Sequence, residues 1–224
     1  MTRIYQRLVD AWGARGPSIA GPQKSFGVDF SHGLFVVLFA AVLALPCVLV
    51  GMPPGYDSEY HVAYQYQFSR QFWSGDLYPH WLMGANKGFG SPIFLIQYPL
   101  PYFVAALLRP VMGFPADELP EARELGVLCF LAFVAAGLFA RIWLRKRCSP
   151  SAATIGALLY ISLPYVLGQS LYLRTGLGEL CAFVWMPLAL AVCEARLLGL
   201  KAIAALALVW ALLLLSHLTS ALLF

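Results

Sequence analysis

Long stretches of the chain are almost entirely apolar, and the polar residues gather between them. Each of five stretches comes close to the ~20 residues that an α-helix needs to cross the hydrocarbon core of a bilayer. They cover about residues 33–52, 125–144, 152–168, 180–198 and 202–224. The pattern therefore predicts an all-α, polytopic helical membrane protein, with its membrane domain over residues 33–224.

A further apolar segment, residues 93–112, decides the topology. The basic run Arg145-Lys146-Arg147 and the N-terminal tail, residues 1–32, are both expected in the cytoplasm, and they agree only if this segment does not cross. Prolines in and beside the segment also make it a poor uninterrupted helix. We therefore expect a re-entrant or surface-lying segment within one long external loop, residues 53–124, and a second external loop at residues 169–179.

The composition supports a membrane protein and argues against several other classes. Hydrophobic residues make up 60% of the 224 residues and charged residues only 12%, too few to cover a soluble domain. The formal charge of +4 comes without a basic patch interleaved with aromatics, so no nucleic acid partner is expected. The five cysteines lack metal-ligand or disulfide spacing and are expected in the core. Because the chain stops inside an apolar run, we expect it to be the N-terminal portion of a larger bundle.

The sequence YDSEYH, residues 56–61, opens the first external loop with a helical pattern. Asp57, His61 and Gln65 fall on one stripe, beside an aromatic stripe that is typical of a helix at a membrane interface. A carboxylate and an imidazole one turn apart can jointly hold a divalent ion, or the acid can serve as a general base. The simpler alternative is that Asp57 caps the helix and His61 is solvated.

The rest of this loop, GDLYPHWLMGANKGFGSPIFLIQYPLPYF, is rich in glycine, proline and aromatic residues. Such a composition favours an ordered cover packed on the bundle over a slack linker. Lys87 or Arg109 is a candidate contact for a lipid phosphate, and His80 is a candidate cavity residue. Anchoring at the membrane interface explains the same residues equally well.

The second external loop, GQSLYLRTGLGE, carries one base, Arg174, and one acid, Glu179. Glu179 can lie close to Asp57 in the folded protein. Two carboxylates that lie close together at a membrane face can form a divalent metal site, for Mg²⁺ or Mn²⁺. An Arg174–Glu179 ion pair that closes the turn is the alternative. Farther on, His217 either faces the cavity or packs between helices.

Several motifs follow one another over about residues 31–224: YDSEYH, then GDLYPHW, GFGSPIF and YPLPYF, then LLYISLPYVL leading into LYLRTGLGE, and finally SHLTSALL. Together they resemble the GT-C class of polytopic glycosyltransferases, and more narrowly a bacterial membrane family labelled "6-pyruvoyl-tetrahydropterin synthase-related". The resemblance implies a GT-C-like bundle with juxtamembrane helices in its first external loop. It also implies an essential acid at Asp57 and a second acid at Glu179, with Arg174 at the arginine position. The chain has too few spans for a complete enzyme of this class.

The function that the resemblance implies is transfer of a sugar from a polyprenyl-phosphate donor to an acceptor, on the outer face of the cytoplasmic (inner) membrane. Asp57 would be the base or a metal-orienting acid, Glu179 a second metal or acceptor contact, and His61 an auxiliary metal ligand. Arg174 would contact phosphate, with Lys87 as a further candidate. The alternative is a non-enzymatic scaffold or transporter component in envelope polysaccharide or lipid assembly. Pterin synthase activity is not expected, because the four histidines are scattered.

Overall fold

The computed structural model describes residues 26–112, 120–195 and 199–224. Within these ranges the chain folds into helices and connecting loops, with no β-structure beyond a single bridge between Leu82 and Ser91. The all-α prediction is therefore confirmed for these residues. Most of the predicted cytoplasmic tail lies outside the described residues.

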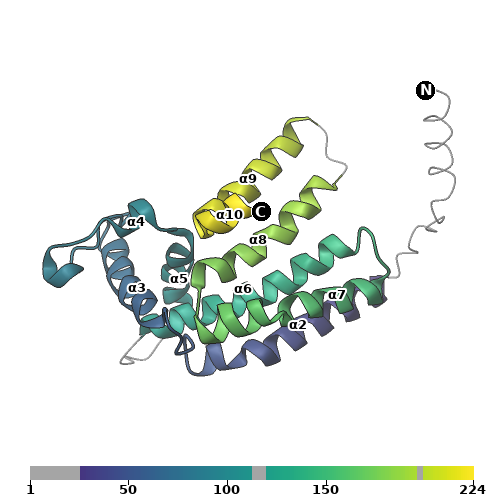
Figure 1. Cartoon of the computed structure of the whole chain (residues 1–224), viewed down its shortest axis with the longest axis horizontal. Coiled ribbons are helices and arrows are strands. Elements are labelled where there is room, and N and C mark those ends of the chain that lie inside the picture. The colour runs from purple at the N-terminus through teal and green to yellow at the C-terminus, as the bar shows by residue number, and fades with distance from the viewer. Residues whose placement is uncertain (1–25, 113–119, 196–198) are drawn as a thin grey trace.

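The helices form a bundle and a separate layer at one end of it (Figure 1). The bundle consists of α2 (Phe26–Leu49), α6 (Pro120–Leu144), α7 (Pro150–Ser162), the π-helix η2 (Pro164–Leu173), α8 (Leu177–Cys193), α9 (Leu200–Ser216) and the short α10 (Leu218–Leu223). The external layer consists of α3 (Ser58–Trp73), the 3-10 turn η1 (Asn86–Gly88), α4 (Ile93–Ile96) and α5 (Leu100–Met112).

Helices α2 and α6 run antiparallel and pack along each other (Figure 1). At one end the backbone N–H of Met52 donates to the carbonyl of Ala122 over 2.7 Å. At the other end the carboxylate of Asp29 accepts a hydrogen bond from Arg145 over 2.9 Å. The segment 53–121 therefore leaves and re-enters the bundle at one end, and the basic run that follows α6 lies at the opposite end.

The close contact of these two helices depends on a glycine. A Cβ atom at Gly126 would lie 2.1 Å from the carbonyl oxygen of Cys47 and 2.7 Å from the Cα atom of Gly51. No real side chain tolerates such distances, so only glycine lets α6 approach the end of α2 this closely.

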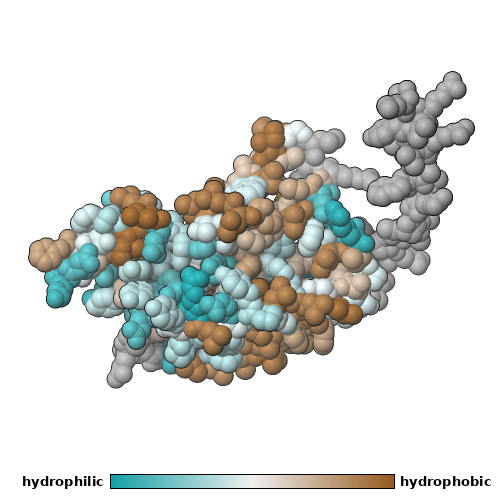
Figure 2. All heavy atoms as spheres, in the orientation of Figure 1, coloured by the Kyte–Doolittle hydropathy of each residue, from teal (hydrophilic) through white to brown (hydrophobic). Residues whose placement is uncertain are grey.

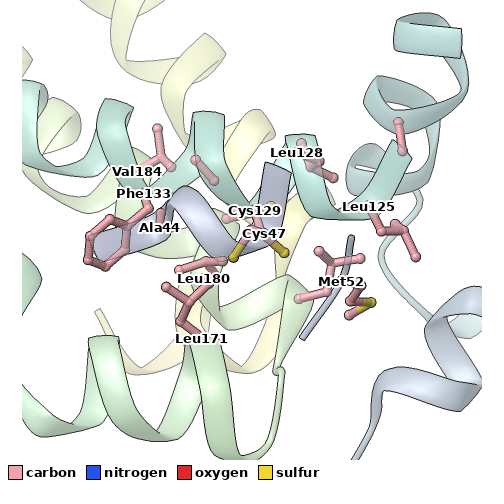
Figure 3. Packing of buried hydrophobic residues seen from close by; sticks show 14 of the residues in the cluster. Ala44, Cys47, Met52, Leu125, Leu128, Cys129, Phe133, Leu171, Leu180 and Val184 are labelled. Carbon is pink, nitrogen blue, oxygen red and sulfur yellow. The ribbon is translucent and has the colours of Figure 1, made fainter. Parts of the chain in front are cut away.

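Apolar side chains of α2, α6, η2 and α8 pack together in the core (Figure 3), which continues into α3, α4 and α5 through Phe68, Phe94 and Tyr102. Cys47, Cys129 and Cys181 are buried there as free thiols, as expected from the sequence. The same expectation is wrong for Cys148 and Cys193, which are exposed. One lies in the turn after α6 and the other is the last residue of α8, so both fall where the helices leave the core.

Two helices are long and apolar enough to cross a membrane, Asp29–Leu49 within α2 and Pro120–Leu144, which is α6. Taken together as one bent span, α7 and η2 are also long and apolar enough to cross a membrane, with a bend of 41° at the break between them. Helices α8 and α9 are apolar but have only 17 residues each. By length and composition, two or three of the described helices are thus able to span a membrane.

Backbone breaks interrupt three of the predicted apolar stretches. The stretch 152–168 changes from α7 to η2 at Leu163, whose ψ of 134° is not helical. The stretch 202–224 breaks at His217, which is extended with φ −164° and ψ 105°. The segment 93–112, which is predicted not to cross the membrane, contains two helices, α4 and α5, separated by a short proline-containing loop. Hydropathy does not reveal these breaks, because the residues on both sides are equally apolar.

The polar stripe of α3 faces inward and holds the external layer on the bundle. Gln65 Nε2 donates to the buried carboxylate of Glu124 in α6 over 2.7 Å, and Arg109 of α5 donates to Ser69 Oγ over 3.0 Å. Arg109 also lies 3.4 Å from carboxylate oxygens of both Glu121 and Glu124. Arg109 therefore clamps the layer onto α6, in place of the lipid-phosphate contact considered from the sequence.

Candidate functional site

The two loops that are predicted to be external are joined by backbone contacts at the start of α3. The N–H of Asp57 donates to the carbonyl of Arg174 over 2.9 Å, although the two residues are 117 positions apart. A Cβ atom at Gly55 would lie 2.0 Å from Thr175 Oγ1, so glycine is needed for this approach. The end of η2 and the start of α3 thereby form one scaffold.

Thr175 is strained at the centre of this scaffold. It is 1% exposed, has a φ of 57° in the left-handed region, and its hydroxyl has no hydrogen-bond partner in the part of the chain that the structure describes. A β-branched residue rarely adopts this conformation, which costs on the order of 1–3 kcal/mol and is found mainly where function imposes it. Here it turns the chain from Arg174 into α8, which carries Glu179 in its first turn.

Arg174 lies between two carboxylates. Its Nε donates to Asp57 Oδ2 over 2.8 Å, and its Nη1 donates to Glu179 Oε1 over 3.0 Å. The hydrogen bond with Asp57 raises the pKa of Arg174 above its ordinary value. The second oxygen of Glu179 accepts from the hydroxyls of Tyr165 at 3.1 Å and Ser170 at 3.5 Å. The three charged groups carry a net charge of −1 and form a shared network, which we call the Arg174 network.

This geometry excludes one of the alternatives considered for Asp57. The residue occupies the N-cap position of α3, but its side chain makes no capping hydrogen bond, so the capping interpretation is wrong. The carboxylate turns to Arg174 instead. The ion pair between Arg174 and Glu179 is present, and Asp57 extends it across the two loops.

His61 lies one helical turn from Asp57 and is buried, so the prediction of a solvated ring is wrong. Only 5% of the residue is exposed, and its Nδ1 lies 2.6 Å from the hydroxyl of the fully buried Tyr102. Burial lowers the pKa of His61 to about 4, against a smaller opposing effect of Asp57, so the ring is neutral at pH 7. If the Tyr102 hydroxyl donates to Nδ1, the proton of the imidazole is on Nε2, which has no protein partner among the described residues.

A cavity of about 490 Å³ opens beside the Arg174 network, between α3, the loop before α5 and the junction of α9 and α10. Its walls include the charged residues Asp57 and Arg174, the histidines His61 and His217, and the tyrosines Tyr60, Tyr64 and Tyr98. The ring of Tyr98 meets that of His217 edge-on, with centroids 5.3 Å apart. Figure 2 shows hydrophilic surface where the external layer meets the bundle, and again at the opposite end near the turn after α6. The cavity thus offers charged groups and aromatic faces together.

Two residues proposed from the sequence lie elsewhere. Lys87 is exposed in η1, and His80 is exposed with Nδ1 3.0 Å from the carbonyl of Tyr78. Neither lines the 490 Å³ cavity. In contrast, Tyr98 and Tyr102 were missed as site residues. The repeated prolines and tyrosines of YPLPYF were the available signal, but they indicated only an ordered segment.

The donor set at this site fits a guanidinium better than a metal ion. The described residues contain no cluster of three or more His, Cys, Asp or Glu side chains able to hold a metal. The cation that Asp57 and Glu179 share is the Arg174 side chain, and His61 is engaged with Tyr102. A divalent metal at this site therefore stays a prediction.

Comparisons with protein-family models, curated proteins and solved structures give no match for the chain.

Proposed function

We propose that the chain is a GT-C-like glycosyltransferase, or the N-terminal part of one, that transfers a sugar from a polyprenyl-phosphate donor to an acceptor. The observation that carries the proposal is that Asp57 and Glu179, from two separate loops, share Arg174 beside a cavity with polar and aromatic walls. Acids brought together from distant loops are expected of a reaction site more than of a structural turn.

The orientation follows from charge. Arg145 and the basic residues after it lie at the end of the bundle opposite the cavity. The positive-inside rule places that end in the cytoplasm, and the cavity therefore faces the outer side of the inner membrane. In this multi-pass arrangement the external layer rests over the outer ends of the spans, where a lipid-linked donor presents its head group.

Asp57, Arg174 and the tyrosines of the cavity each have a role in the proposed transfer. The acceptor hydroxyl loses its proton to Asp57 while its oxygen bonds to the anomeric carbon, and the bond from that carbon to the phosphate oxygen breaks. Arg174 stabilises the phosphate that leaves. A guanidinium has five N–H groups, and Asp57 and Glu179 use two of them, which leaves three for phosphate oxygens. The faces of Tyr60, Tyr64 and Tyr98 provide surface for a sugar ring.

The test replaces Asp57 by Asn in membranes that contain the protein, with transfer of labelled sugar from a polyprenyl-phosphate donor as the readout. Loss of the general base is expected to lower the rate by about 10²-fold or more at equal protein level. Glu59→Gln is the matched control, because Glu59 is exposed on another side of α3 and is expected to leave the rate unchanged. Full activity of Asp57→Asn would contradict the catalytic assignment. Absence of transfer by the unchanged protein would favour a non-enzymatic scaffold.

A further inference from the structure

One nitrogen of the His61 ring is buried without a partner in the part of the chain that the structure describes. Nδ1 lies 2.6 Å from the hydroxyl of Tyr102, whereas Nε2 has no hydrogen-bond partner there. The residue is 5% exposed and lines the cavity of about 490 Å³. Buried polar groups in native proteins are rarely left unpaired. An unpaired nitrogen in the wall of a cavity therefore indicates a partner that binds from within the cavity.

The contact with Tyr102 settles which nitrogen of His61 carries the proton. Burial lowers the pKa of His61 to about 4, so at pH 7 the ring holds a single N–H proton. If Nδ1 donated it to Tyr102, the phenolic proton and the lone pair of Nε2 would both lack partners among the described residues. If the phenol donates to Nδ1, only the Nε2–H is unpaired. The second arrangement leaves fewer buried groups unpaired, so His61 presents Nε2–H.

His217 shows the same tautomer in another wall of the cavity. The backbone N–H of Ser220 donates to its Nδ1 over 3.2 Å. A backbone N–H can only donate, so Nδ1 carries no proton and the ring proton is on Nε2. A protonated Nε2 has no lone pair for a metal ion. The two histidines therefore suit a ligand that accepts hydrogen bonds.

The order of groups along α3 shows which part of a ligand meets His61. Arg174 contacts Asp57 at the start of the helix, and His61 lies one turn farther along, at about 6 Å of helix rise. In the proposed transfer the leaving phosphate is at Arg174 and the acceptor hydroxyl is at Asp57. His61 then lies beyond the acceptor hydroxyl, on the side away from the phosphate, and is placed to contact the acceptor.

We propose that His61 determines acceptor specificity, because its Nε2–H donates to an oxygen that the acceptor carries beside its reacting hydroxyl, and that Tyr102 is the positioning residue that keeps the proton on Nε2. The inference rests on the proposed function and names a feature of its acceptor. A simple alcohol would leave the Nε2–H unpaired, and an ammonium group has no lone pair to accept it. A hydroxyl with a neighbouring oxygen, as in a saccharide, satisfies both Asp57 and His61.

The first test is nitrogen NMR of the purified protein with isotope-labelled histidines. The chain has four histidines, and the signals of His61 are those that His61→Gln removes. The unchanged protein is expected to carry the proton of this ring on Nε2, and Tyr102→Phe is expected to give a mixture of tautomers. Tyr78→Phe is the matched control, because its hydroxyl donates to the carbonyl of Phe94 in the same layer. A proton on Nδ1 in the unchanged protein overturns the inference.

The second test measures transfer of labelled sugar in membranes at equal protein level. His61→Leu removes the donor and is expected to lower the rate by about tenfold or more. His61→Gln should stay within about threefold of the unchanged protein, because its amide oxygen can accept from Tyr102 while its N–H replaces Nε2–H. Tyr102→Phe should fall between the two, and Tyr78→Phe should leave the rate unchanged.

The outcomes separate this inference from the proposed function. An unchanged rate in His61→Leu, or equal losses in His61→Leu and His61→Gln, overturns the donor role of His61. Label joined to an amine, or to an acceptor without an oxygen beside the new bond, overturns the acceptor assignment. In each of these cases the transfer itself leaves the proposed function standing. Absence of transfer by the unchanged protein overturns the proposed function, and the acceptor contact with it.

Discussion

The imidazole of His61 is held by the hydroxyl of Tyr102 across 2.6 Å, between α3 and α5 of the external layer. Both side chains are buried, and the neutral ring is the form that this environment favours. The contact links α3, which begins directly after Asp57, to α5. It therefore fixes the orientation of α3 at the place where the catalytic acid is proposed.

This contact predicts a fall in stability with acid. The pKa of His61 is about 4 in the folded protein and about 6.5 in an unfolded chain, so protons bind the unfolded state more strongly between these values. The stabilising effect of the neutral ring is complete above about pH 6.5 and is lost as the pH falls toward 4, by up to about 3 kcal/mol. Unfolding in detergent at a series of pH values measures it.

His61→Gln keeps a hydrogen-bonding side chain but cannot titrate, so this variant should have a shallower dependence on pH over the same range. His80→Gln is the control, because that ring is exposed and its loss should leave the dependence as it is. Identical pH profiles for the unchanged protein and His61→Gln would show that another group causes the fall.

Gly55→Ala should separate the two external loops. The added Cβ atom would lie 2.0 Å from Thr175 Oγ1 and 2.9 Å from the carbonyl carbon of Arg174, so part of the clash is with backbone that cannot move aside. We expect a loss of about 1–3 kcal/mol in unfolding free energy and a loss of sugar transfer. Gly168→Ala, where a Cβ atom meets nothing within 4 Å, should change neither. Normal activity of Gly55→Ala would mean that the two loops need not touch.

Glu124→Ala should loosen the external layer from α6. The carboxylate is fully buried and is bound by Gln65 and Arg109, so its removal leaves a buried amide without a partner and weakens the clamp. We expect a loss of about 3 kcal/mol in unfolding free energy. Glu59→Ala, at an exposed position of the same layer, should change it by less than about 0.5 kcal/mol. Similar stabilities of the two variants would argue against a structural role for the clamp.

Thiol labelling should report the orientation in the membrane. Cys148 and Cys193 are exposed near the basic end of the bundle, so a membrane-impermeant maleimide should reach them from the cytoplasmic side. Phe89 is 87% exposed in the external layer, and a Phe89→Cys variant should be labelled from the outer side. Labelling of Cys148 from outside would reverse the orientation on which the proposed function depends. The three buried cysteines serve as unreactive internal controls.

Sequence patterns located the helices more successfully than the contacts between them. Periodicity placed Asp57 and His61 on one face of α3, because spacing along a helix is a local property. It did not show that this face is buried, since the partners Tyr102 and Glu124 come from distant segments. The sharing of Arg174 depends on Gly55 and on the backbone of Thr175, and neither leaves a signature that a single sequence reveals.

The hydrogen bond between Met52 and Ala122 has a consequence for how the external layer can vary. It brings the two ends of the segment 53–121 together at the base, so the distance between α2 and α6 does not depend on what the segment contains. Insertions or deletions at exposed turns within the segment would then leave the register of α2 against α6 unchanged. The external layer is therefore anchored to the bundle at this closed base and, separately, through the contacts of Gln65 and Arg109 with α6.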